Sequence, residues 1–388
     1  MRKTISILGS TGSIGLSCFK IIDKKKKYFR INVLSANKNY RLIVKQIKKY
    51  KPNYFIINDN FTYQKLKKNN RSKTKILNNF DTLNFKRKID ITISAIPGIA
   101  GLRPTINFIS CSKKLLIANK ESVICGWGII KKIAKKNKTK IIPIDSEHFS
   151  ISRLLFKYKI SEIKKIFITA SGGPFLNYKI SRFKNIKPIE AIKHPKWKMG
   201  KKISVDSSTL MNKILELIEA EKLFNIPNNK LDIIIHPNSL VHAIVKLKNG
   251  LSEFIYHDTT MIVPIANAMF DGNFDIEDLY KQKNNYVENK LIFLKVDKKR
   301  FPIIRIKPVV TKYASSPIII NASNEILVDQ FLKRKIPFLG IYKIIMSILR
   351  DRNYKKNAIK SCKNINQITK LDNWARKITF KKIKSIYA

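Results

Sequence analysis

Three glycines near the start of the chain have a spacing that suits phosphate binding. Gly9, Gly12 and Gly15 follow a short apolar run and precede a segment with helical patterning. In a turn between a strand and a helix, glycines let the backbone approach a pyrophosphate, and the helix offers its first N–H groups as donors. The spacing G-x-x-G-x-x-G varies the usual G-x-G-x-x-G, and glycines also occur in ordinary turns. We predict a dinucleotide-binding turn at residues 9–15.

The end of the second predicted strand bears on the choice of dinucleotide. A site selective for NAD has an Asp or Glu there, which binds the ribose hydroxyls. This chain has Asn37, Lys38 and Asn39 instead, and a lysine suits the 2′-phosphate of NADP. The competing interpretation is that lysine is so common in this chain that Lys38 carries little information. We predict NADP rather than NAD.

Two carboxylates, Asp145 and Glu147, follow another predicted strand. In an extended chain, residues i and i+2 point to the same side, so the two would project together. Such a pair repels unless a cation lies between its members, and oxygen ligands suit Mg²⁺ or Mn²⁺. A helix N-terminus is the equally weighted alternative, because Asp145 and Ser146 are capping residue types.

A predicted helix at residues 209–224, capped by Ser208 or Thr209, adds a third carboxylate. Asn212, Lys213 and Glu216 share one face of it, at positions i, i+1 and i+4. Polar helix faces are usually solvated surface. The alternative is a site in which Glu216 completes a set of three metal-binding carboxylates, while Lys213 and Asn212 hold an anionic substrate.

Three loops add further candidate groups. Residues 170–175 offer Ser171 beside two glycines, which suits a phosphate. Lys120 lies at the end of a predicted strand, the edge of the sheet where ligands bind in such folds. Trp197 and Met199, in residues 194–200, form either a lid or a structural aromatic anchor. We predict structural roles for His236 and His242.

The elements that must position these groups alternate at first between strand and helix. Within residues 1–150 we expect strands at 5–8, 31–35, 54–57, 89–95, 114–118 and 140–144, with helices such as 14–23 and 40–50. This alternation indicates a Rossmann-like parallel sheet with helices on both faces. Residues 151–285 read as an α+β domain, with strands at 163–170, 231–235 and 243–247. A connector at 286–305 and a helical domain at 306–388, with helices at 322–332, 340–349 and 373–386, complete the predicted α/β architecture.

Composition excludes several classes of protein. The 388 residues include 78 Lys and Arg and 26 Asp and Glu, so the formal net charge is +52. A hydrophobic content of 44% excludes a disordered basic tail, and no apolar run approaches the ~20 residues of a membrane helix. A nucleic-acid partner is one interpretation of the charge. We prefer compositional drift, because Lys, Ile and Asn, which have AT-rich codons, are abundant along the whole chain.

Four widely spaced cysteines suggest neither a zinc site nor a disulfide framework. We expect free thiols in a reducing compartment. Because no apolar signal core is visible at the start, we predict a cytoplasmic protein with neither a membrane nor a specific nucleic acid as partner.

Six ordered motifs resemble the 1-deoxy-D-xylulose 5-phosphate reductoisomerase family. They are GSTGSIG (9–15), ANKES (118–122), DSEH (145–148), SGGPF (171–175), HPKWKMG (194–200) and VDSSTLMNKILE (205–216). The segment NASNEI (321–326) is also similar, so the resemblance spans nearly the whole chain. Asn37, where the family usually has Gly, and residues 258–265, which lack a common Arg, depart from the family pattern.

The resemblance implies an NADPH- and divalent-metal-dependent oxidoreductase, typically a homodimer. It would convert 1-deoxy-D-xylulose 5-phosphate to 2-C-methyl-D-erythritol 4-phosphate in the non-mevalonate isoprenoid pathway. The implied ligands of Mn²⁺ or Mg²⁺ are Asp145, Glu147 and Glu216. The implied NADPH contacts are Thr11, Gly12, Ser13, Ile14, Asn37, Lys38, Asn39, Asn119, Glu121 and Gly200. The implied substrate contacts are Lys120, Ser146, Glu147, Ser171, His194, Ser207, Asn212, Lys213 and Glu216. Trp197 and Met199 would lie on a mobile lid.

Two other functions are compatible with parts of the sequence. A different NADP-dependent dehydrogenase on a similar architecture would need no metal. A nucleic-acid-binding protein on an inactive dinucleotide-binding scaffold would bind selectively at physiological salt, whereas binding that disappears with salt would reflect only the charge.

Overall fold

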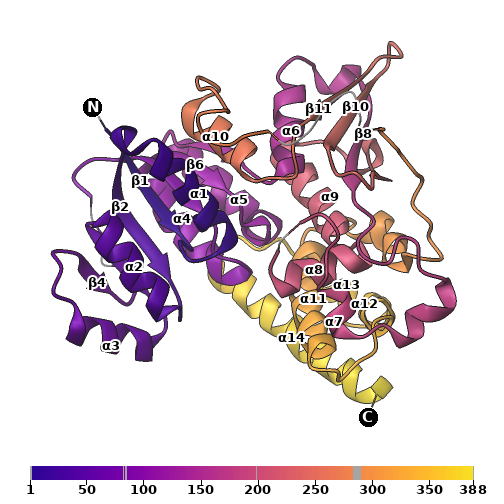
Figure 1. The fold of residues 1–388 in the computed structure, drawn as a ribbon. Helices are drawn as coiled ribbons and strands as arrows, with labels where there is room; N and C mark the ends of the chain where they lie inside the picture. Colours follow the sequence, from indigo (N-terminus) through magenta and orange to yellow (C-terminus); the bar gives the residue numbers. More distant parts are fainter. Residues whose placement is uncertain (1, 82, 84, 198, 283–289, 388) are drawn as a thin grey trace. The chain divides into compact units, whose positions relative to one another are not determined.

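The computed structural model describes residues 2–81, 83, 85–197, 199–282 and 290–387 (Figure 1). These residues form two compact units. The first contains residues 1–122, 128–149 and the described part of 260–283. The second contains residues 123–127, 150–259 and the described part of 284–388. The chain therefore enters the first unit again after a long excursion into the second.

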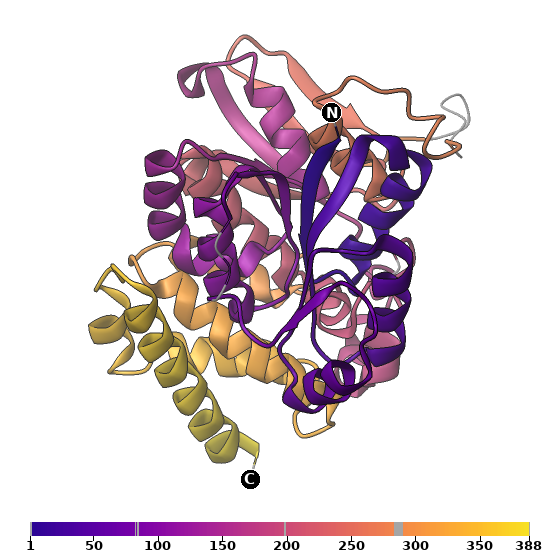
Figure 2. The same ribbon diagram turned by 90° about the vertical axis from the view of Figure 1, so that its left-hand side faces the viewer.

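A parallel seven-stranded sheet forms the centre of the first unit (Figure 2). Its spatial order is β4-β3-β2-β1-β5-β6-β7, and every neighbouring pair is parallel. The strands are β1 (Lys3–Leu8), β2 (Phe29–Ala36), β3 (Tyr54–Ile57), β4 (Lys75–Leu77), β5 (Ile89–Ser94), β6 (Ser112–Ile117) and β7 (Lys140–Pro143). The chain order reverses at β1, which lies between β2 and β5. Such a reversal opens a crevice at the carboxyl ends of the strands, where ligands bind in this class of sheet.

Helices connect these strands, as parallel pairing requires. They are α1 (Ser13–Lys24), α2 (Tyr40–Tyr50), α3 (Asn60–Asn69), α4 (Leu102–Ser110) and α5 (Lys120–Lys136). The fully buried side chains of Ile5, Ile7 and Leu34 form part of the core. Helix α10 (Ile262–Phe270) comes from far along the chain, packs against α1 and adds Ile265 and Met269 to the same core.

A smaller mixed sheet lies in the second unit, in the order β11-β10-β8-β9. Its strands are β8 (Ile163–Ala170), β9 (Leu231–Ile235), β10 (Val241–Leu247) and β11 (Ser252–Tyr256). Strands β8 and β9 are parallel, and the other two pairs are antiparallel. Helix α9 (Met211–Phe224) packs against β8 and β9 and follows α8 (Lys201–Thr209).

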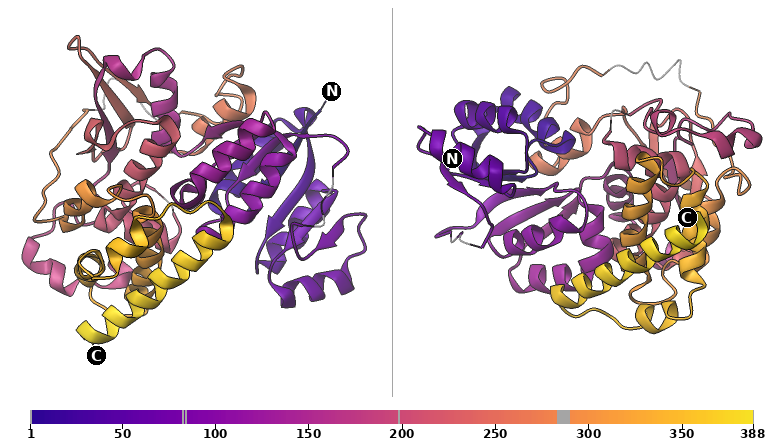
Figure 3. Two further views of the ribbon diagram at one scale, coloured as in Figure 1. Left: turned by 180° about the vertical axis from the view of Figure 1, so that it is seen from behind. Right: turned by 90° about the horizontal axis from the view of Figure 1, so that it is seen from below.

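The rest of the second unit is mainly helical. It contains α7 (Pro188–Ala191), α11 (Ser316–Leu332), α12 (Gly340–Leu349), α13 (Tyr354–Ala358) and α14 (Ile365–Tyr387), the long yellow helix of Figure 3. Helix α14 packs along α11, where the guanidinium of Arg376 pairs with Glu325 and Asp372. Helix α6 (Ser146–Leu155) spans the boundary of the two units. Short 3-10 helices lie at Lys26–Tyr28, Ile99–Gly101, Ile160–Glu162, Ile180–Asn185, Asn228–Lys230 and Pro302–Val309.

The predicted fold class is confirmed: a parallel sheet with helices comes first, a second sheet follows, and helices dominate the C-terminal part. The division into domains at 150, 285 and 305 stays a prediction. None of the described helices combines the length and apolar character needed to cross a lipid bilayer.

One predicted helix begins at a different residue from the one expected. Residues 209–224 do not form a single helix, because Leu210 has a left-handed conformation (φ 63°) that separates α8 from α9. Ser208 and Thr209 therefore lie at the end of α8, and the Oγ1 of Thr209 accepts the N–H of Met211, the first residue of α9, at 3.2 Å. Two other predicted helices begin earlier than expected, at Ser316 and Ile365.

Candidate active site

The glycine-rich turn is held tightly against the carboxyl ends of β2 and β5. The N–H groups of Gly9 and Ser10 both donate to the carbonyl of Ser35, at 3.1 and 2.8 Å. Gly9 has a φ of 88°, and a Cβ added to it would lie 2.7 Å from the carbonyl oxygen of Ala95. A Cβ on Gly15 would lie only 2.5 Å from the carbonyl oxygen of Ser10. Both positions therefore require glycine.

Gly12 directly precedes α1, so the first-turn amides of this helix point towards the turn. The first amides of a helix have no partner within the helix, and together with the helix dipole they attract an anion. Of the predicted cofactor residues, Thr11, Gly12, Ser13 and Ile14 all lie on this turn or in the first turn of α1.

The predicted 2′-phosphate group lies one strand away, at the end of β2. Asn39 caps α2, and its side chain accepts the N–H of Leu42 at 3.2 Å. The Lys38 side chain is 77% exposed, and its Nζ lies 3.9 Å from the Asp59 carboxylate. At this exposure the pair contributes little to stability, so the ammonium of Lys38 can turn to a phosphate.

Asn119 fixes the loops that follow β5 and β6. Its side chain caps α5 by accepting the N–H of Ser122 at 2.5 Å, and its Nδ2 donates to the carbonyls of Ile96 and Gly98. Glu121, in the first turn of α5, is buried beside it, and its Oε2 is 3.4 Å from the Nδ2 of Asn119. The predicted cofactor contacts of the first unit thus lie along the carboxyl edge of one sheet. Gly200 lies in the second unit, where it precedes α8.

Two predicted metal ligands belong to the segment that joins β7 to α6. Asp145 lies between the two elements, and its Oδ2 is 3.1 Å from the Nζ of the buried Lys120. Glu147 lies in the first turn of α6, where its Oε2 accepts the hydroxyl of Ser146 at 2.5 Å. The expectation that Asp145 and Glu147 share one side of an extended strand is wrong, because β7 ends at Pro143 and the helix begins at Ser146.

The third predicted ligand, Glu216, lies on α9 in the second unit. Its Oε2 accepts from the Nζ of Lys213 at 2.7 Å, and its Oε1 accepts from the Nδ2 of Asn212. The predicted common face of these residues is confirmed, and all three are buried, so this face is not a solvated surface. Burying a carboxylate is costly unless it is paired and hydrogen-bonded, and here Lys213 provides the cation and Asn212 a hydrogen bond.

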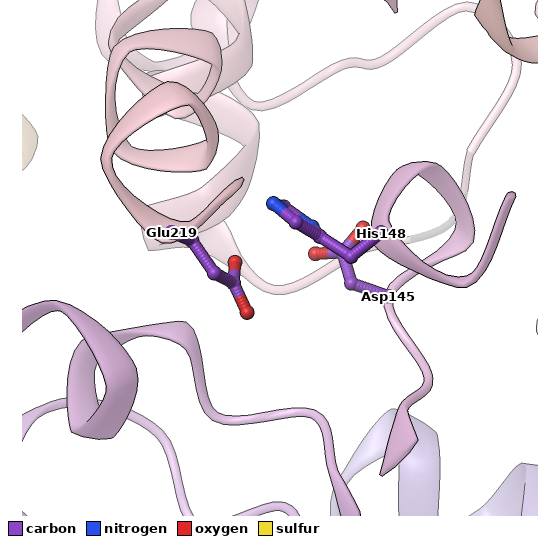
Figure 4. Close-up of side chains that lie close together, drawn as sticks. All are labelled: Asp145, His148 and Glu219. Carbon is purple, nitrogen blue, oxygen red and sulfur yellow. The ribbon is translucent and has the colours of Figure 1, made fainter. Parts of the chain in front are cut away.

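Two further buried groups have the chemistry of metal ligands and were not singled out from the sequence. They are His148, in the first turn of α6, and Glu219, on α9; Figure 4 shows both side chains together with Asp145. Their spacing of three residues from a predicted ligand, one helical turn, was the available signal.

A compact anion-binding corner lies at the end of β8. Gly172 and Gly173 have φ values of 82° and 63°, so the backbone turns sharply after Ser171. A Cβ on Gly173 would lie 3.1 Å from the carbonyl oxygen of Ser207, which places this loop directly against the end of α8. The structure thus brings Ser171 and Ser207, two predicted substrate contacts, to neighbouring backbone segments.

His194 completes this corner in a defined protonation state. Its Nδ1 accepts the backbone N–H groups of Lys196 and Trp197, at 3.1 and 2.9 Å. In the neutral ring the proton is therefore on Nε2, which donates to the Oγ of Ser171 at 2.9 Å. The N–H of Gly173 donates to the same oxygen at 3.1 Å. Since Ser171 accepts twice, its own hydroxyl proton remains for a bound anion.

We expect His194 to stay neutral throughout the physiological pH range. Burial, and secondly the positive charge of Lys213, lower the pKa of His194 from 6.5 to about 4. The folded protein therefore binds this proton more weakly than the unfolded chain, so His194 destabilises the fold as the pH falls from 6.5 towards 4. An NMR titration of the ring resonances measures this pKa directly. A midpoint near 6.5 would contradict the assigned contacts.

Comparison with known proteins identifies relatives of the whole chain. Three family sequence models match: 1-deoxy-D-xylulose 5-phosphate reductoisomerase at residues 5–127, the C-terminal domain of that enzyme at 141–224, and the DXP reductoisomerase C-terminal domain at 258–378. The chain is 44% identical to 1-deoxy-D-xylulose 5-phosphate reductoisomerase of Pelagibacter ubique (strain HTCC1062), over 96% of this chain and 97% of that protein. It is 39% identical to the enzyme of Wolbachia pipientis wMel, over 90% of each.

Solved structures give the same result. A DOX-P reductoisomerase in complex with NADPH, fosmidomycin and magnesium matches with a TM-score of 0.90 and 31% identity, over 98% of each chain. The 1-deoxy-D-xylulose 5-phosphate reductoisomerase from Zymomonas mobilis, in complex with NADPH, matches with a TM-score of 0.88 and 29% identity over the full length of both.

Proposed function

This chain belongs to the 1-deoxy-D-xylulose 5-phosphate reductoisomerase family, and we propose on that premise that it performs the family's reaction. It converts 1-deoxy-D-xylulose 5-phosphate to 2-C-methyl-D-erythritol 4-phosphate with NADPH and a divalent metal ion, in the non-mevalonate isoprenoid pathway. The observation that carries the proposal is the buried Asn212–Lys213–Glu216 cluster on α9. Polar helix faces are usually solvated, but this one buries an ion pair and an amide. Such a buried polar cluster fits a site for a metal and an anion.

We propose that Asp145, Glu147 and Glu216 bind the metal. They are carboxylates, the ligand type that Mg²⁺ and Mn²⁺ prefer. When bound, the metal supplies Lewis acidity at the substrate oxygens and NADPH supplies the hydride. In this chain, Lys120 pairs with Asp145 through a 3.1 Å contact, while Lys213 and Asn212 orient the carboxylate of Glu216.

We propose that the corner around Ser171 binds the substrate phosphate. Ser171, Ser207, Asn212 and Lys213 provide hydroxyl, amide and ammonium donors, and the neutral His194 directs the hydroxyl of Ser171 outward. A firmly held phosphate orients the reacting carbons, which raises the rate by reducing the entropy lost in the reaction. Lys120, Ser146, Glu147 and Glu216 are the other proposed substrate contacts.

We propose that NADPH binds along the carboxyl edge of the parallel sheet. Its pyrophosphate would lie at Thr11, Gly12, Ser13 and Ile14, where the turn and the α1 N-terminus offer backbone N–H groups. Asn37, Lys38 and Asn39 would bind the 2′-phosphate, while Asn119, Glu121 and Gly200 complete the set of contacts. The proposed domain division is 1–150 for the cofactor, 151–285 for catalysis and dimerisation, 286–305 as connector and 306–388 as helical domain.

The Lys38→Ala substitution should weaken the binding of NADPH and leave the binding of NADH nearly unchanged. Loss of one charge-assisted contact to a phosphate is expected to raise the KM for NADPH about tenfold. The KM for NADH, which lacks the 2′-phosphate, should change less than about twofold. Lys45→Ala is the matched control, since Lys45 is an exposed lysine of α2 and its loss changes the net charge equally. Equal effects of Lys38→Ala on both dinucleotides would contradict the assignment.

The test of the proposed function is NADPH oxidation by the purified chain with 1-deoxy-D-xylulose 5-phosphate and Mn²⁺ or Mg²⁺. We expect turnover that stops on chelation and resumes when metal is added. Folded protein without turnover would refute the proposal, and reduction of another substrate that survives complete chelation would favour a metal-free dehydrogenase.

We propose that the protein is a homodimer in the cytoplasm. Strand β11 is an edge strand of the smaller sheet. The side chain of Phe254 on this strand is 45% exposed, and that of Leu251, just before it, is 60% exposed. Exposed apolar edges of this kind favour pairing with another chain. All four cysteines are free, which fits a reducing compartment.

Phe254→Lys should therefore shift the dimer towards monomer. A charge on this edge disfavours pairing between two copies. Sedimentation velocity at several protein concentrations measures the shift, with Phe61→Lys, at a 78% exposed phenylalanine of the first unit, as the control. A monomeric parent protein would refute the proposed dimer.

A further inference from the structure

Two buried histidines of the second unit are stacked on one another. The rings of His242, on β10, and His257, just after β11, lie 3.8 Å apart between centroids with an interplanar angle of 17°. They are only 2% and 5% exposed. The pairing of β10 with β11 shifts register between Val241 and Ala243, at the position of His242. Such irregularities redirect a side chain, and here the redirected ring belongs to the stack.

Hydrogen bonds fix the orientation of both rings. The Nε2 of His242 lies 3.2 Å from the carbonyl oxygen of His257, and the Nδ1 of His257 lies 2.8 Å from the carbonyl oxygen of Asp258. Because a carbonyl only accepts, each of these nitrogens carries a proton. The stack is thus a rigid surface and not a pair of freely rotating side chains.

The indole of Trp197 contacts one ring of this stack, that of His242. Trp197 and His242 meet edge to face, with centroids 6.2 Å apart and an angle of 71°. The backbone N–H of Trp197 also donates to the Nδ1 of His194 at 2.9 Å. Trp197 is therefore held at its backbone by a proposed substrate contact and at its ring by a histidine pair outside the proposed site.

We propose that the His242–His257 stack is a seat for Trp197, and that His257 is a positioning residue that acts through His242. This inference rests on the proposed function, in which His194, three residues before Trp197, lies at the corner that binds the substrate phosphate. His257 does not contact the indole in the contacts described above, but it supports the ring that does. Without it, His242 loses its stacking partner, and Trp197 loses a fixed surface. Trp197 should then spend more time away from this surface, and the backbone contact that it makes with His194 should be looser. We expect this to weaken substrate binding more than it slows the chemical step.

The experiment compares His257→Ala, which removes the ring, with His257→Phe, which keeps a stacking ring of similar size. Limited trypsin digestion of the full chain measures how firmly Trp197 is held on the stack, because Lys193, Lys196 and Lys201 are exposed around it. For His257→Ala we expect cleavage at these lysines at least about fivefold faster than in the parent protein. We also expect a KM for the sugar phosphate raised at least about fivefold, with kcat within about twofold. His257→Phe should restore both quantities.

The control is His236→Ala, which removes another buried histidine that stacks on an aromatic ring. The ring centroids of His236 and Phe293 lie 4.8 Å apart. This variant should leave cleavage at the three lysines unchanged. If His257→Ala does not fold, His257→Leu fills the volume without an aromatic ring and should behave as predicted for alanine. Unchanged cleavage and KM in the variant that folds, or failure of His257→Phe to restore them, would overturn the proposal. If the parent protein does not turn over the sugar phosphate, the proposed function fails, but the digestion still tests the seat.

Discussion

Glu216→Gln lowers kcat/KM for 1-deoxy-D-xylulose 5-phosphate at least about 100-fold, close to 2.7 kcal/mol of transition-state stabilisation. The amide keeps the shape of the side chain and loses its charge. In the parent protein the carboxylate is 1% exposed and accepts hydrogen bonds from Lys213 and Asn212, so its position is fixed. A neutral ligand at this place binds a divalent ion more weakly, and the charge of the Lys213–Glu216 pair is no longer balanced.

Titration of Mn²⁺ separates the two effects. A loss of metal affinity shifts the half-saturating metal concentration upward, whereas a loss of substrate positioning lowers the rate at saturating metal. Glu221→Gln is the matched control, because Glu221 lies on the same helix and burial already raises its pKa towards the neutral form. It should retain activity within about threefold. Parent-like activity of Glu216→Gln at ordinary metal concentrations would remove Glu216 from the metal site.

Gly15→Ala should abolish tight NADPH binding, with the Kd raised about 100-fold. The new Cβ would lie 2.5 Å from the carbonyl oxygen of Ser10, which is backbone and cannot move aside without opening the turn. Overpacking of this kind also costs roughly 1–3 kcal/mol of stability. NADPH fluorescence measures the affinity, and thermal unfolding without ligand measures the stability.

Gly128→Ala is the control for the second prediction. Gly128 lies within α5, no atom lies within 4 Å of a Cβ built there, and alanine is favoured over glycine in a helix by about 0.5–1 kcal/mol. The same chemical change should therefore stabilise the protein slightly at residue 128 and leave NADPH binding intact. Equal NADPH affinities for both variants would show that the turn does not carry the pyrophosphate.

Local patterns were sufficient to place the buried strands. The sequence predictions at 54–57, 163–170 and 231–235 coincide with β3, β8 and β9, because short runs of β-branched and aromatic residues read as strands wherever they are packed. Helix α2 is likewise predicted at its observed bounds. Its apolar and charged residues recur at helical spacing, which predicts an amphipathic helix.

The site residues were harder to place because their conformations depend on distant contacts. Nothing near Leu210 in the sequence signals a left-handed residue, which costs energy without a glycine. Its burial and the packing of α8 and α9 on their neighbours hold it there. Similarly, the extended-strand geometry assumed for Asp145 and Glu147 fails because the first turn of α6 starts between them. In both cases the error lies in the local backbone conformation.

His257 shows a different limit of sequence reasoning. Its sequence neighbours give no sign of a partner, since its stacking contact with His242 joins positions on opposite sides of a β-hairpin. Cross-strand neighbours of this kind become visible only once the register of the two strands is known.

The path of the chain restricts how this gene can be divided. Helix α10 is translated long after the sheet whose core it completes, so a nascent first unit lacks Ile265 and Met269 until residue 270 has left the ribosome. Any single truncation between residue 149 and α10 exposes the apolar face of α1 that α10 packs against. Such a fragment would be prone to aggregation. Two-fragment complementation systems, or swaps of the cofactor half between homologues, would have to transfer α10 together with residues 1–149.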